Sequence, residues 1–393
     1  MKDTLRIGVN ARALSVDEPG GAVQAAVQMV RAFASRDDAE VILFGHQRVG
    51  RHFPDLPLDS TGYVVDSQLY GVLWERAVLP RRASLANVDV LLAPNGNGPV
   101  HETPYPTVVW VHDVNAVRGY SAGIHRLYRK ATVPRAVAAA EAVTTISEFS
   151  KKEISKYLPV DQTDVHVIHN GLTEPYLDAA RAEPDTPSLS STPAADGGTT
   201  SFKTSNTDIP EQYVLFVGSA NPRKNIARLI NSFAQLRQET TLPHELVIAG
   251  PSAKRIFSQI DVDASAKRDA AVTSVGFVSD SELRALYQGA DCFVFPSLYE
   301  GFGLPPLEAM AMGTPVVTSN VASLPEICGN AAMYVDPEQI DDIADGIRTV
   351  LRDKEFAAKC RARGRDRALQ FTWNAAADQF ITIARNISME SSV

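Results

Sequence analysis

The stretch DCFVFPSLYEGFGLPPLEAMAMGTPVV, residues 291–317, predicts a strand, a glycine loop and a helix in direct succession. The apolar run at 292–295 is short enough to be a buried parallel strand, and the proline after it ends the strand in a turn. The Pro-Pro pair suits a first helical turn, because the N–H group that proline lacks would have no intrahelical partner there. The sequence therefore places Glu308 in that first turn and Glu300 just before the loop.

Seven residues separate Glu300 from Glu308, and they include the glycine loop and the helix N-terminus. Two carboxylates in this arrangement can hold the hydroxyl groups of a ligand while the exposed backbone N–H groups meet an anion. This combination suits a nucleotide sugar. The alternative interpretation is that both glutamates are ordinary helix-start charges, since acidic residues favour first turns.

The run EGFGLPPLE, residues 300–308, closely resembles the signature of the retaining glycosyltransferase family 4. That family has an α/β fold, GT-B, in which two Rossmann-like domains with parallel sheets face each other across a cleft. The resemblance implies that Glu300 contacts the donor sugar and that Glu308 contacts the ribose. It also implies donor contacts from the loop between them, formed by Gly301, Phe302, Gly303 and Leu304.

Length and composition indicate a globular chain of two domains. With a prior of about 100–200 residues per domain, 393 residues favour two domains over one. Apolar residues at 45% and charged residues at 21% fit neither a disordered chain nor a collagen-like fibre. The net charge of −8 argues against nucleic acid as a partner. The three cysteines, Cys292, Cys328 and Cys360, are too widely spaced for a zinc site or a disulfide framework.

The cysteine usage and the N-terminal stretch MKDTLRIGVNARAL favour a cytoplasmic location. This stretch leads straight into a short strand and lacks the apolar core of a signal peptide. No apolar run reaches the roughly 18 residues that a transmembrane helix needs. Attachment at the inner face of a membrane is left open.

A strand at 5–9 and a helix at 22–33 predict a β-loop-α start to a first domain, residues 1–182. Gly20 and Gly21 come just before that helix, where the absence of a Cβ lets backbone N–H groups approach a phosphate or a sugar. A plain flexible loop is the alternative, and the spacing is not that of a dinucleotide fingerprint. The family resemblance implies that this glycine pair faces the cleft and contacts the donor.

Further apolar runs alternate with helical segments and predict a parallel sheet in the first domain. Ligands bind beyond the carboxyl ends of such strands, so residues that directly follow them are functional candidates. His112 follows the strand at 108–111. The resemblance implies that His112 reaches the donor sugar and the reacting face, whereas a lone histidine is otherwise more often structural. The remaining runs are 41–44, 88–93, 142–146 and 165–168, and three are followed by Asn95, Ser147 and Asn170.

The segment at 118–156 is basic, with an excess of five positive charges. One interpretation is an ordinary solvated face. The other is a surface that attracts anionic lipid or a diphosphate-linked acceptor, at about 1 kcal/mol per basic residue near a charged membrane. This second interpretation leaves open a peripheral contact with a membrane surface.

Residues 183–212 are rich in Ser, Thr and Pro and almost free of large apolar side chains. Such a composition cannot form a packed element, so we expect an interdomain linker or a mobile insertion that holds the domain boundary. A second Rossmann-like domain is expected at 213–372. A terminal helix is expected at 373–393, either crossing back to the first domain or capping the second.

In the second domain, a strand at 213–217 leads through a loop with Ser219, Arg223 and Lys224 into a helix. Cations are unfavourable at a helix N-terminus, so something anionic should compensate them. A diphosphate would meet the helix N-terminus, the planar fork of Arg223 and the point charge of Lys224. The loop also resembles the Arg-Lys-Asn segment of family 4, which binds the donor diphosphate. Phe277 follows another strand, at a place where relatives stack the base.

Together these motifs predict a retaining glycosyltransferase that moves a hexose from a nucleotide-sugar donor to a hydroxyl of a glycan or lipid-linked saccharide. The catalytic candidates are His112, Glu300, Arg223 and Lys224. No cofactor or metal is expected, because the cations and helix N-termini would stabilise the leaving diphosphate. The only Asp-X-Asp sequence, at 261–263, lies in a helix-like stretch away from every predicted strand end.

The motifs most resemble those of the bacterial mannosyltransferases of polysaccharide assembly, which makes GDP-mannose the first choice of donor. A UDP-hexose or a deoxyhexose donor is the alternative. A GT-B sugar-nucleotide epimerase should lack the complete EGFGLPPLE run together with the Arg-Lys-Asn segment. A non-catalytic binder should lack His112 or Glu300, and both are present.

Overall fold

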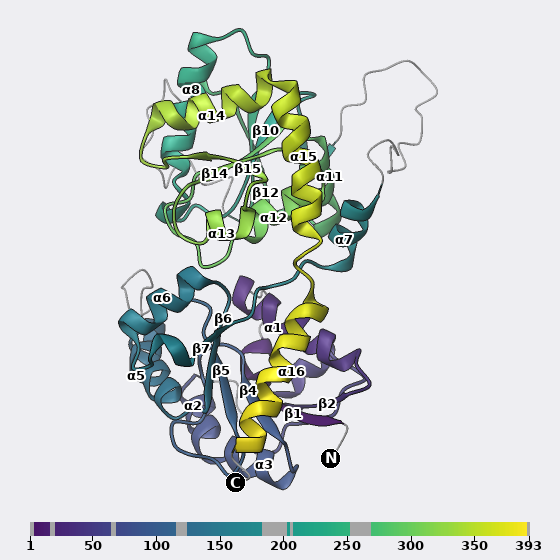
Figure 1. Ribbon diagram of the computed structural model, residues 1–393, viewed down its shortest axis with the longest axis vertical. Helices are drawn as coiled ribbons and strands as arrows, with labels where there is room; N and C mark the ends of the chain where they lie inside the picture. The colour runs from purple at the N-terminus through teal and green to yellow at the C-terminus, as the bar shows by residue number, and fades with distance from the viewer. Residues whose placement is uncertain are drawn as a thin grey trace. The chain divides into compact units, whose positions relative to one another are not determined.

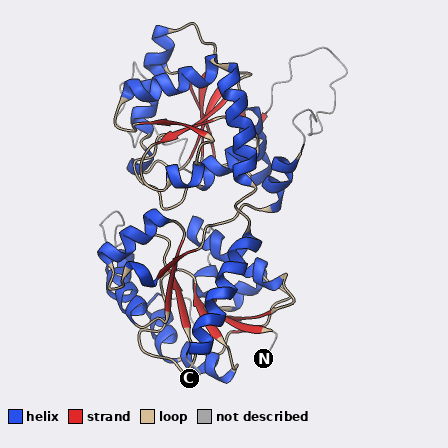
Figure 2. Cartoon of the chain, in the orientation of Figure 1, coloured by secondary structure: helices blue, strands red, loops and turns tan. Residues whose placement is uncertain are grey.

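The computed structural model describes residues 4–15, 20–63, 68–114, 124–182, 203–204, 207–251 and 269–390 (Figure 1). The contacts of the chain divide it into two compact units. The first comprises Met1–Gly171 together with Phe371–Val393, and the second comprises Leu172–Gln370. Each unit has its own parallel sheet with covering helices (Figure 2).

The first unit is built on a sheet of seven described strands, all paired in parallel, in the order β3-β2-β1-β4-β5-β6-β7. The order reverses between β1 and β4, so right-handed crossovers place helices on both faces. The strands are β1 (Leu5–Asn10), β2 (Ala39–Phe44), β3 (Leu58–Asp59), β4 (Val90–Ala93), β5 (Thr107–Trp110), β6 (Ala142–Thr145) and β7 (Val165–Val167).

The central strands of this sheet are apolar throughout because helices bury both faces. All four residues of β4 and all four of β5 are buried. One core cluster packs Val109 and Val143 of the sheet against Val137 and Ile154 of the helices. The helices are α1 (Gly21–Ala34), α2 (Gln68–Ala77), α3 (Leu79–Leu85), α5 (Ile124–Ala138), α6 (Glu148–Tyr157) and α16 (Trp373–Glu390).

The second unit has a parallel sheet of six described strands in the order β12-β11-β10-β13-β14-β15. Its strand order reverses between β10 and β13. The strands are β10 (Tyr213–Val217), β11 (Glu245–Ala249), β12 (Val272–Gly276), β13 (Cys292–Phe295), β14 (Val316–Ser319) and β15 (Ala332–Val335). The helices are α7 (Glu174–Arg181), α8 (Ile226–Glu239), α11 (Asp280–Gly289), α12 (Leu304–Ala311), α13 (Leu324–Cys328), α14 (Ile340–Arg352) and α15 (Lys354–Ala368).

The boundary between the units differs from the predicted end of the first domain at residue 182. Helix α7 belongs to the second unit, where it contacts α12 and α15. Tyr176 of α7 makes an edge contact with Tyr287 at 6.4 Å between ring centroids, and Arg365 donates to the carbonyl of Ala182. The apolar face of α7 is buried in this contact, which is why its contacts group it with the second unit.

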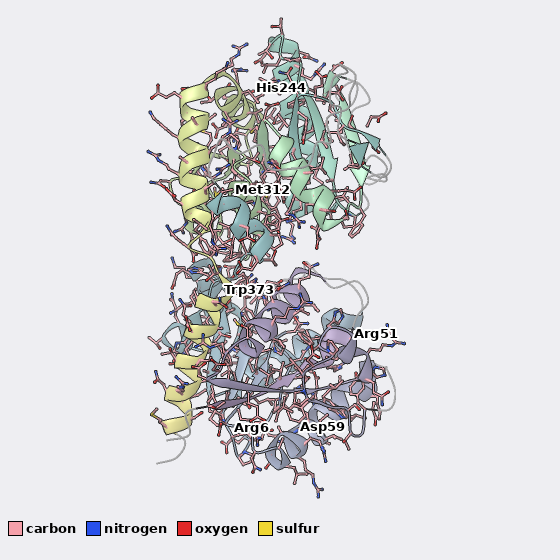
Figure 3. The ribbon with its side chains drawn as sticks, turned by 90° about the vertical axis from the view of Figure 1, so that its right-hand side faces the viewer. Arg6, Arg51, Asp59, His244, Met312 and Trp373 are labelled. Atoms are coloured by element: carbon pink, nitrogen blue, oxygen red, sulfur yellow. The ribbon has the colours of Figure 1, made fainter. Side chains whose placement is uncertain are left out.

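The terminal helix α16 begins at Trp373, which is labelled in Figure 3, and it belongs to the first unit. Phe380 packs on Phe33 of α1 at 4.9 Å between ring centroids, and Asp378 pairs with Arg36. Aromatic burial and this ion pair therefore attach the end of the chain to the first sheet's helical layer.

Most of the predicted linker at 183–212 lies outside the described residues. Two short strands within it, β8 (Lys203–Thr204) and β9 (Thr207–Asp208), form an antiparallel pair that the composition did not predict. Among the helices that the structure describes, none has an apolar run long enough to cross a bilayer.

Candidate functional site

The sheet of the second unit brings two predicted loops to one place. The loop after β10 and the loop after β13 both begin at the carboxyl edge of the sheet, and these two strands are neighbours. They are also the pair between which the strand order reverses. Crevices at such reversals are the usual ligand sites of doubly wound sheets.

An ion cluster joins these two loops. The Glu300 carboxylate accepts a hydrogen bond from Lys224 Nζ at 2.7 Å and one from an Arg223 terminal nitrogen at 2.9 Å. Ser297 Oγ lies 2.6 Å from Glu300 Oε1 and donates to it. Glu300 and Lys224 are each only 8% exposed. Glu300 is thus in direct contact with Arg223 and Lys224, which lie more than 70 positions earlier in the sequence. The sequence analysis singled out all three residues.

The charges in this cluster shift the protonation of its members. Burial alone would raise the pKa of Glu300, but the charges of Lys224 and Arg223 and the bonds from Lys224 and Ser297 hold that pKa below its usual value. Burial lowers the pKa of Lys224, and the Glu300 charge opposes this effect. The Lys224 ammonium also lies 4.5 Å from the centroid of the Phe295 ring. Glu300 is therefore an ionised acceptor surrounded by donors.

Asn225 completes the tie between the two loops. Its backbone is left-handed, with φ of 59°, a conformation that asparagine tolerates better than most residues. Its side-chain amide donates to the carbonyls of Pro296 and Pro337, at 3.0 and 2.6 Å. The Arg-Lys-Asn segment therefore presents two cations and uses its third residue to fix their position.

The structure corrects the predicted place of Glu308. Helix α12 begins at Leu304, because Gly303, with φ of 118°, forms its N-cap. The proline pair therefore occupies the second and third positions, and Glu308 lies in the second turn. No acidic residue is in the first turn, so Glu308 is not an ordinary helix-start charge.

Glu308 instead sits in a half-buried setting that raises its pKa to about 7. Burial is the main cause, the charge of Asp280 adds to it, and a hydrogen bond from Tyr287 opposes it. The Tyr287 hydroxyl donates to Glu308 Oε2 at 3.0 Å, which leaves the other carboxylate oxygen for a further donor. The sequence carried no signal for Tyr287, which is one apolar-face residue of α11.

The loop before α12 is held from behind by a serine that the sequence analysis missed. Ser323 is fully buried, and its hydroxyl lies 2.9 Å from the carbonyl of Glu300 and 2.6 Å from that of Phe302. A Cβ on Gly303 would lie 2.9 Å from the side chain of Leu324, the residue that follows Ser323. Gly303 and Ser323 together define the path of the loop.

The other predicted donor residues of the second unit lie on the same edge of the sheet. Ser219 is half-buried in the loop after β10, beside Gly218. A Cβ on Gly250 would lie 2.3 Å from the carbonyl of Gly218, so the loop after β11 approaches this loop as closely as backbone allows. Phe277 follows β12 and is 78% exposed, an unusual position for a large aromatic side chain.

In the first unit, His112 follows β5 at the carboxyl edge of the sheet. It is 5% exposed, its Nε2 lies 3.0 Å from the carbonyl of Pro94, and its ring lies 4.5 Å from that of Trp110. These contacts fix the imidazole in the way that a structural histidine requires. Glu300 belongs to the other unit, so the approach of both residues to one sugar stays a prediction.

Gly20 and Gly21 form the start of α1. Gly20 is the N-cap, with φ of −69°, and a Cβ on either glycine would meet nothing within 4 Å. Neither backbone strain nor packing within the unit therefore requires glycine here, in contrast to Gly303. A requirement for close approach by a ligand would account for it.

A buried polar network at the end of β1 was not predicted. Glu75 pairs with Arg12 at 2.7 Å and accepts from the Asn10 amide at 2.9 Å. A Cβ on Gly71 would lie 2.1 Å from the Arg12 side chain, so Arg12 crosses directly over that glycine. Asn10 is the last residue of β1 and Arg12 lies two residues beyond it. This position at the carboxyl end of a buried strand is the signal that would have identified them.

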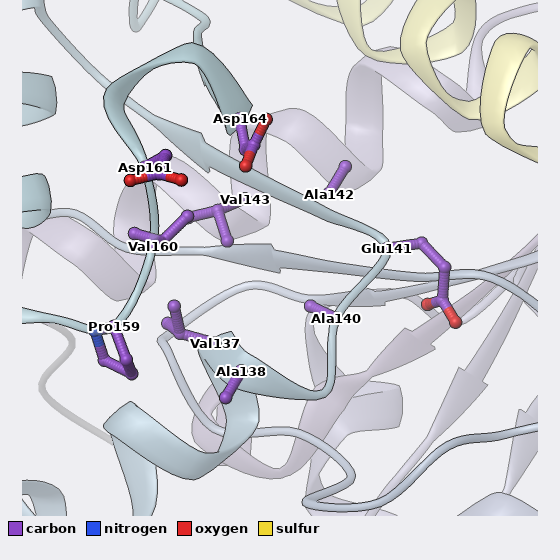
Figure 4. Close-up of a pocket in the computed structure, with 10 residues that line it drawn as sticks. All are labelled: Val137, Ala138, Ala140, Glu141, Ala142, Val143, Pro159, Val160, Asp161 and Asp164. Atoms are coloured by element: carbon purple, nitrogen blue, oxygen red, sulfur yellow. The ribbon is translucent and has the colours of Figure 1, made fainter.

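A cavity of about 280 Å³ lies elsewhere in the first unit (Figure 4). It is at the start of β6, which is the amino edge of the parallel sheet, opposite the edge that carries His112. It therefore has no part in the predicted site. Its lining comprises Val137, Ala138, Ala140, Glu141, Ala142, Val143, Pro159, Val160, Asp161 and Asp164.

Two sequence features remain outside this description. The Asp-X-Asp sequence at 261–263 lies outside the described residues, as does the first part of the basic segment. Of the described basic side chains there, Lys130, Arg135, Lys152 and Lys156 are exposed. Within the described ranges, no group of three or more His, Cys, Asp or Glu side chains could hold a metal ion.

Two doubly wound parallel sheets, each with a reversal of strand order and polar loops at its carboxyl edge, define the GT-B class of glycosyltransferase folds. A solved structure of Anabaena HepE in complex with UDP-glucose matches with a TM-score of 0.68. The match covers 97% of this chain and 100% of that one at 19% identity, so it shows the fold alone. The predicted fold class is confirmed.

The family follows from the sequence matches. A family model described as Glycosyl transferases group 1 matches residues 199–367, and one described as Glycosyltransferase Family 4 matches residues 19–173. The chain therefore contains a domain that matches each of these two glycosyltransferase models, which confirms the resemblance drawn from its motifs. Both predicted donor loops lie within the first of these matches.

Two relatives from Escherichia coli are mannosyltransferases. The O-antigen chain mannosyltransferase B is 32% identical over 254 residues, which are 65% of this chain and 63% of that protein. The serotype-specific mannosyltransferase WbdA is 34% identical over 169 residues, which are 42% of this chain and 20% of that protein. The chain thus spans less than two thirds of the length of either relative.

Proposed function

We propose that this protein transfers mannose from GDP-mannose to a hydroxyl of a glycan or lipid-linked saccharide, with retention of the anomeric configuration. The observation that carries the proposal is the cluster of Glu300, Arg223 and Lys224 at the reversal point of the second sheet. Two cations beside a glycine loop and a helix N-terminus suit a diphosphate. The choice of mannose rests on the two mannosyltransferase relatives.

In this proposal each part of the donor has a partner in the second unit. Arg223 and Lys224 bind the diphosphate and stabilise the charge that develops on it as the sugar departs, so no metal or cofactor is needed. Glu308 accepts hydrogen bonds from the ribose hydroxyls. The exposed ring of Phe277 offers a stacking surface for the base, and Glu300 holds hydroxyls of the sugar.

The first unit contributes His112 and the glycine pair at the start of α1. His112 acts on the donor sugar, and the N–H groups near Gly20 and Gly21 meet an anionic or hydroxyl group. The acceptor is a saccharide of cell-surface polysaccharide or glycoconjugate synthesis. The exposed Lys152 and Lys156 of α6 offer a contact to an anionic membrane surface where a lipid-linked acceptor resides.

A panel of nucleotide sugars tests this function. Thermal stabilisation should be largest with GDP-mannose, because a ligand that binds only the folded state raises the unfolding temperature. If a UDP-hexose or a deoxyhexose donor stabilises the protein more than GDP-mannose does, that donor would be assigned in place of GDP-mannose. Incubation with a saccharide acceptor should yield a product whose anomeric configuration, read by NMR, matches the donor.

The same incubations distinguish the other classes. Conversion of the donor sugar without an acceptor would indicate an epimerase. Binding of the donor with neither transfer nor hydrolysis, across a panel of free and lipid-linked acceptors, would indicate a binding protein. Absence of any stabilisation by nucleotide sugars or nucleoside diphosphates would contradict the proposed function.

A further inference from the structure

The bonding of Glu300 points to a second role for this residue. Its Oε1 accepts hydrogen bonds from Lys224 and Ser297, and its Oε2 accepts one from Arg223. The two cations proposed to bind the donor diphosphate are therefore the same groups that neutralise Glu300. Any diphosphate that reaches Arg223 and Lys224 must share them with this carboxylate.

The charge of the cluster makes this sharing selective. Arg223, Lys224 and Glu300 together carry one net positive charge. A diphosphate esterified at both ends by nucleoside and sugar carries about one negative charge fewer than a free nucleoside diphosphate, because a terminal phosphate has a second pKa of about 6. The extra charge would meet a carboxylate that is only 8% exposed, where water screens it poorly.

The position of the extra charge strengthens the argument. On transfer, the acceptor oxygen bonds to the anomeric carbon and the acceptor proton passes to solvent. The bond to the diphosphate oxygen breaks, and its electron pair stays on that oxygen. This oxygen previously carried the sugar, so it lies toward whatever residue holds the sugar. Glu300 is that residue in the proposed function.

We propose that Glu300 discriminates between the nucleotide-sugar donor and the free nucleoside diphosphate, favouring departure of the product by repelling its terminal phosphate. The inference rests on the proposed function, in that Arg223 and Lys224 bind the diphosphate. It adds a specificity-determining role that the hydrogen bonds to sugar hydroxyls do not supply. Those bonds act only on the donor, whereas the repulsion acts on the product.

The experiment is a double-mutant cycle of Glu300→Gln, Lys224→Gln and the combined variant. The binding of GDP, UDP, inorganic pyrophosphate and GDP-mannose is measured by calorimetry at pH 8 and low salt. Glu300→Gln should bind the nucleoside diphosphate at least about fivefold more tightly than the wild type, which is what one unit charge at contact distance gives even with water-like screening. Its affinity for the nucleotide sugar should rise less or fall.

The cycle remains decisive if Glu300→Gln alone does not fold, because that change leaves the buried Lys224 without its partner. The combined variant removes both charges and should then bind nucleoside diphosphate more tightly than Lys224→Gln. Glu355→Gln is the control for net charge. It removes one exposed carboxylate of α15, which pairs with Lys359, and should leave all of these affinities unchanged.

Three outcomes separate the inference from the proposed function. Tighter product binding without Glu300, fading as salt rises, supports the inference. The inference is overturned if Glu300→Gln binds nucleoside diphosphate no more tightly than the wild type and the combined variant binds it no more tightly than Lys224→Gln. If the wild type still binds nucleoside diphosphate, the proposed function stands. A wild type that binds no nucleoside diphosphate, while thermal unfolding shows that it is folded, overturns both.

Discussion

At the scale of single residues, the two glutamates of the 300–308 motif differ in environment. Glu300 is surrounded by cations, and its pKa is held low. Glu308 faces Tyr287, with Tyr176 and Asp280 nearby, and burial raises its pKa to about 7. One motif therefore contains an acceptor that is ionised at neutral pH and one whose charge depends on pH near neutrality.

Glu308→Gln should change the pH dependence of stability. The folded protein keeps the Glu308 proton up to a pKa of about 7, whereas an unfolded chain loses it near the usual value of about 4.3. The folded state therefore binds more protons in this window, and wild-type stability falls as pH rises through it. Because the side chain is partly exposed, we expect the loss to be about 1–2 kcal/mol.

The measurement is urea unfolding of both proteins at pH 5 and pH 8. Glu308→Gln and the wild type should differ little at pH 5, and the variant should be the more stable at pH 8. Tyr287→Phe removes the bond that lowers the Glu308 pKa, so its stability should decline with pH at least as much as that of the wild type. Parallel curves for Glu308→Gln and the wild type would show that Glu308 is ionised in the folded state.

At the scale of elements, the path of the loop before α12 depends on one backbone conformation. Gly303 has φ of 118°, which side chains of L residues rarely adopt, and it starts α12 at Leu304. The loop is then held by Ser323 on one side and by the Arg-Lys-Asn segment on the other. A change in Gly303 should therefore affect both stability and the cation cluster.

Gly303→Ala should lower the free energy of unfolding by about 1–3 kcal/mol, because alanine would be strained at this φ. Nucleoside diphosphate affinity should fall as well, since Glu300 lies three residues away on the same loop. The matched control is Gly21→Ala, at the first position of α1, where a Cβ meets nothing within 4 Å. Alanine has the higher helix propensity, so this variant should keep or gain stability. Equal effects of the two variants on stability would refute the argument from strain.

Much of this element structure was readable from the sequence. The strand at 292–295 and the one at 213–217 have the predicted bounds, because short apolar runs between turn residues have few other outcomes. The proline pair does lie in the first turn of α12, but Glu308 was placed one turn too early, because Gly303 with φ of 118° starts the helix at Leu304. The direct bonds from Lys224 and Arg223 to Glu300 were not predicted, since sequence spacing carries no information on side-chain partners 76 residues away.

The remaining differences also have physical causes. Helix α7 was assigned to the first domain because it precedes the low-complexity segment, yet its burial depends on which unit offers an apolar surface. Tyr287 and Ser323 gave no signal, because a tyrosine in a helix and a serine before one are common. Their role follows only from the hydroxyl positions in the folded unit.

At the scale of the whole molecule, the chain passes between its two units twice, after Gly171 and after Gln370. A Cβ on Gly171 would lie 2.2 Å from the backbone nitrogen of Trp373, so the two passages run side by side where they meet the first unit. His169 and Phe371 make an edge contact at 5.5 Å between ring centroids at the same place. The two passages are therefore packed together at the first unit.

His112→Ala tests whether the first unit acts in the reaction. The imidazole is fixed by Pro94 and Trp110, and a group in the first unit should act mainly when both units engage one substrate. We therefore expect kcat to fall by about 10²–10⁴-fold if His112 takes part in the chemistry, with a much smaller change in donor affinity. Donor affinity is measured by calorimetry and turnover by product formation under saturating donor.

His112→Asn is the companion variant, because its amide can still bond the Pro94 carbonyl and so preserves the local structure better than alanine. If the histidine is only structural, asparagine should restore turnover and alanine should lower thermal stability along with activity. If it acts on the donor sugar, both variants should stay folded and bind donor while turnover remains low. Normal turnover in His112→Ala would remove this residue from the proposed active site, and the first unit's contribution would then have to come from the glycine pair that begins α1.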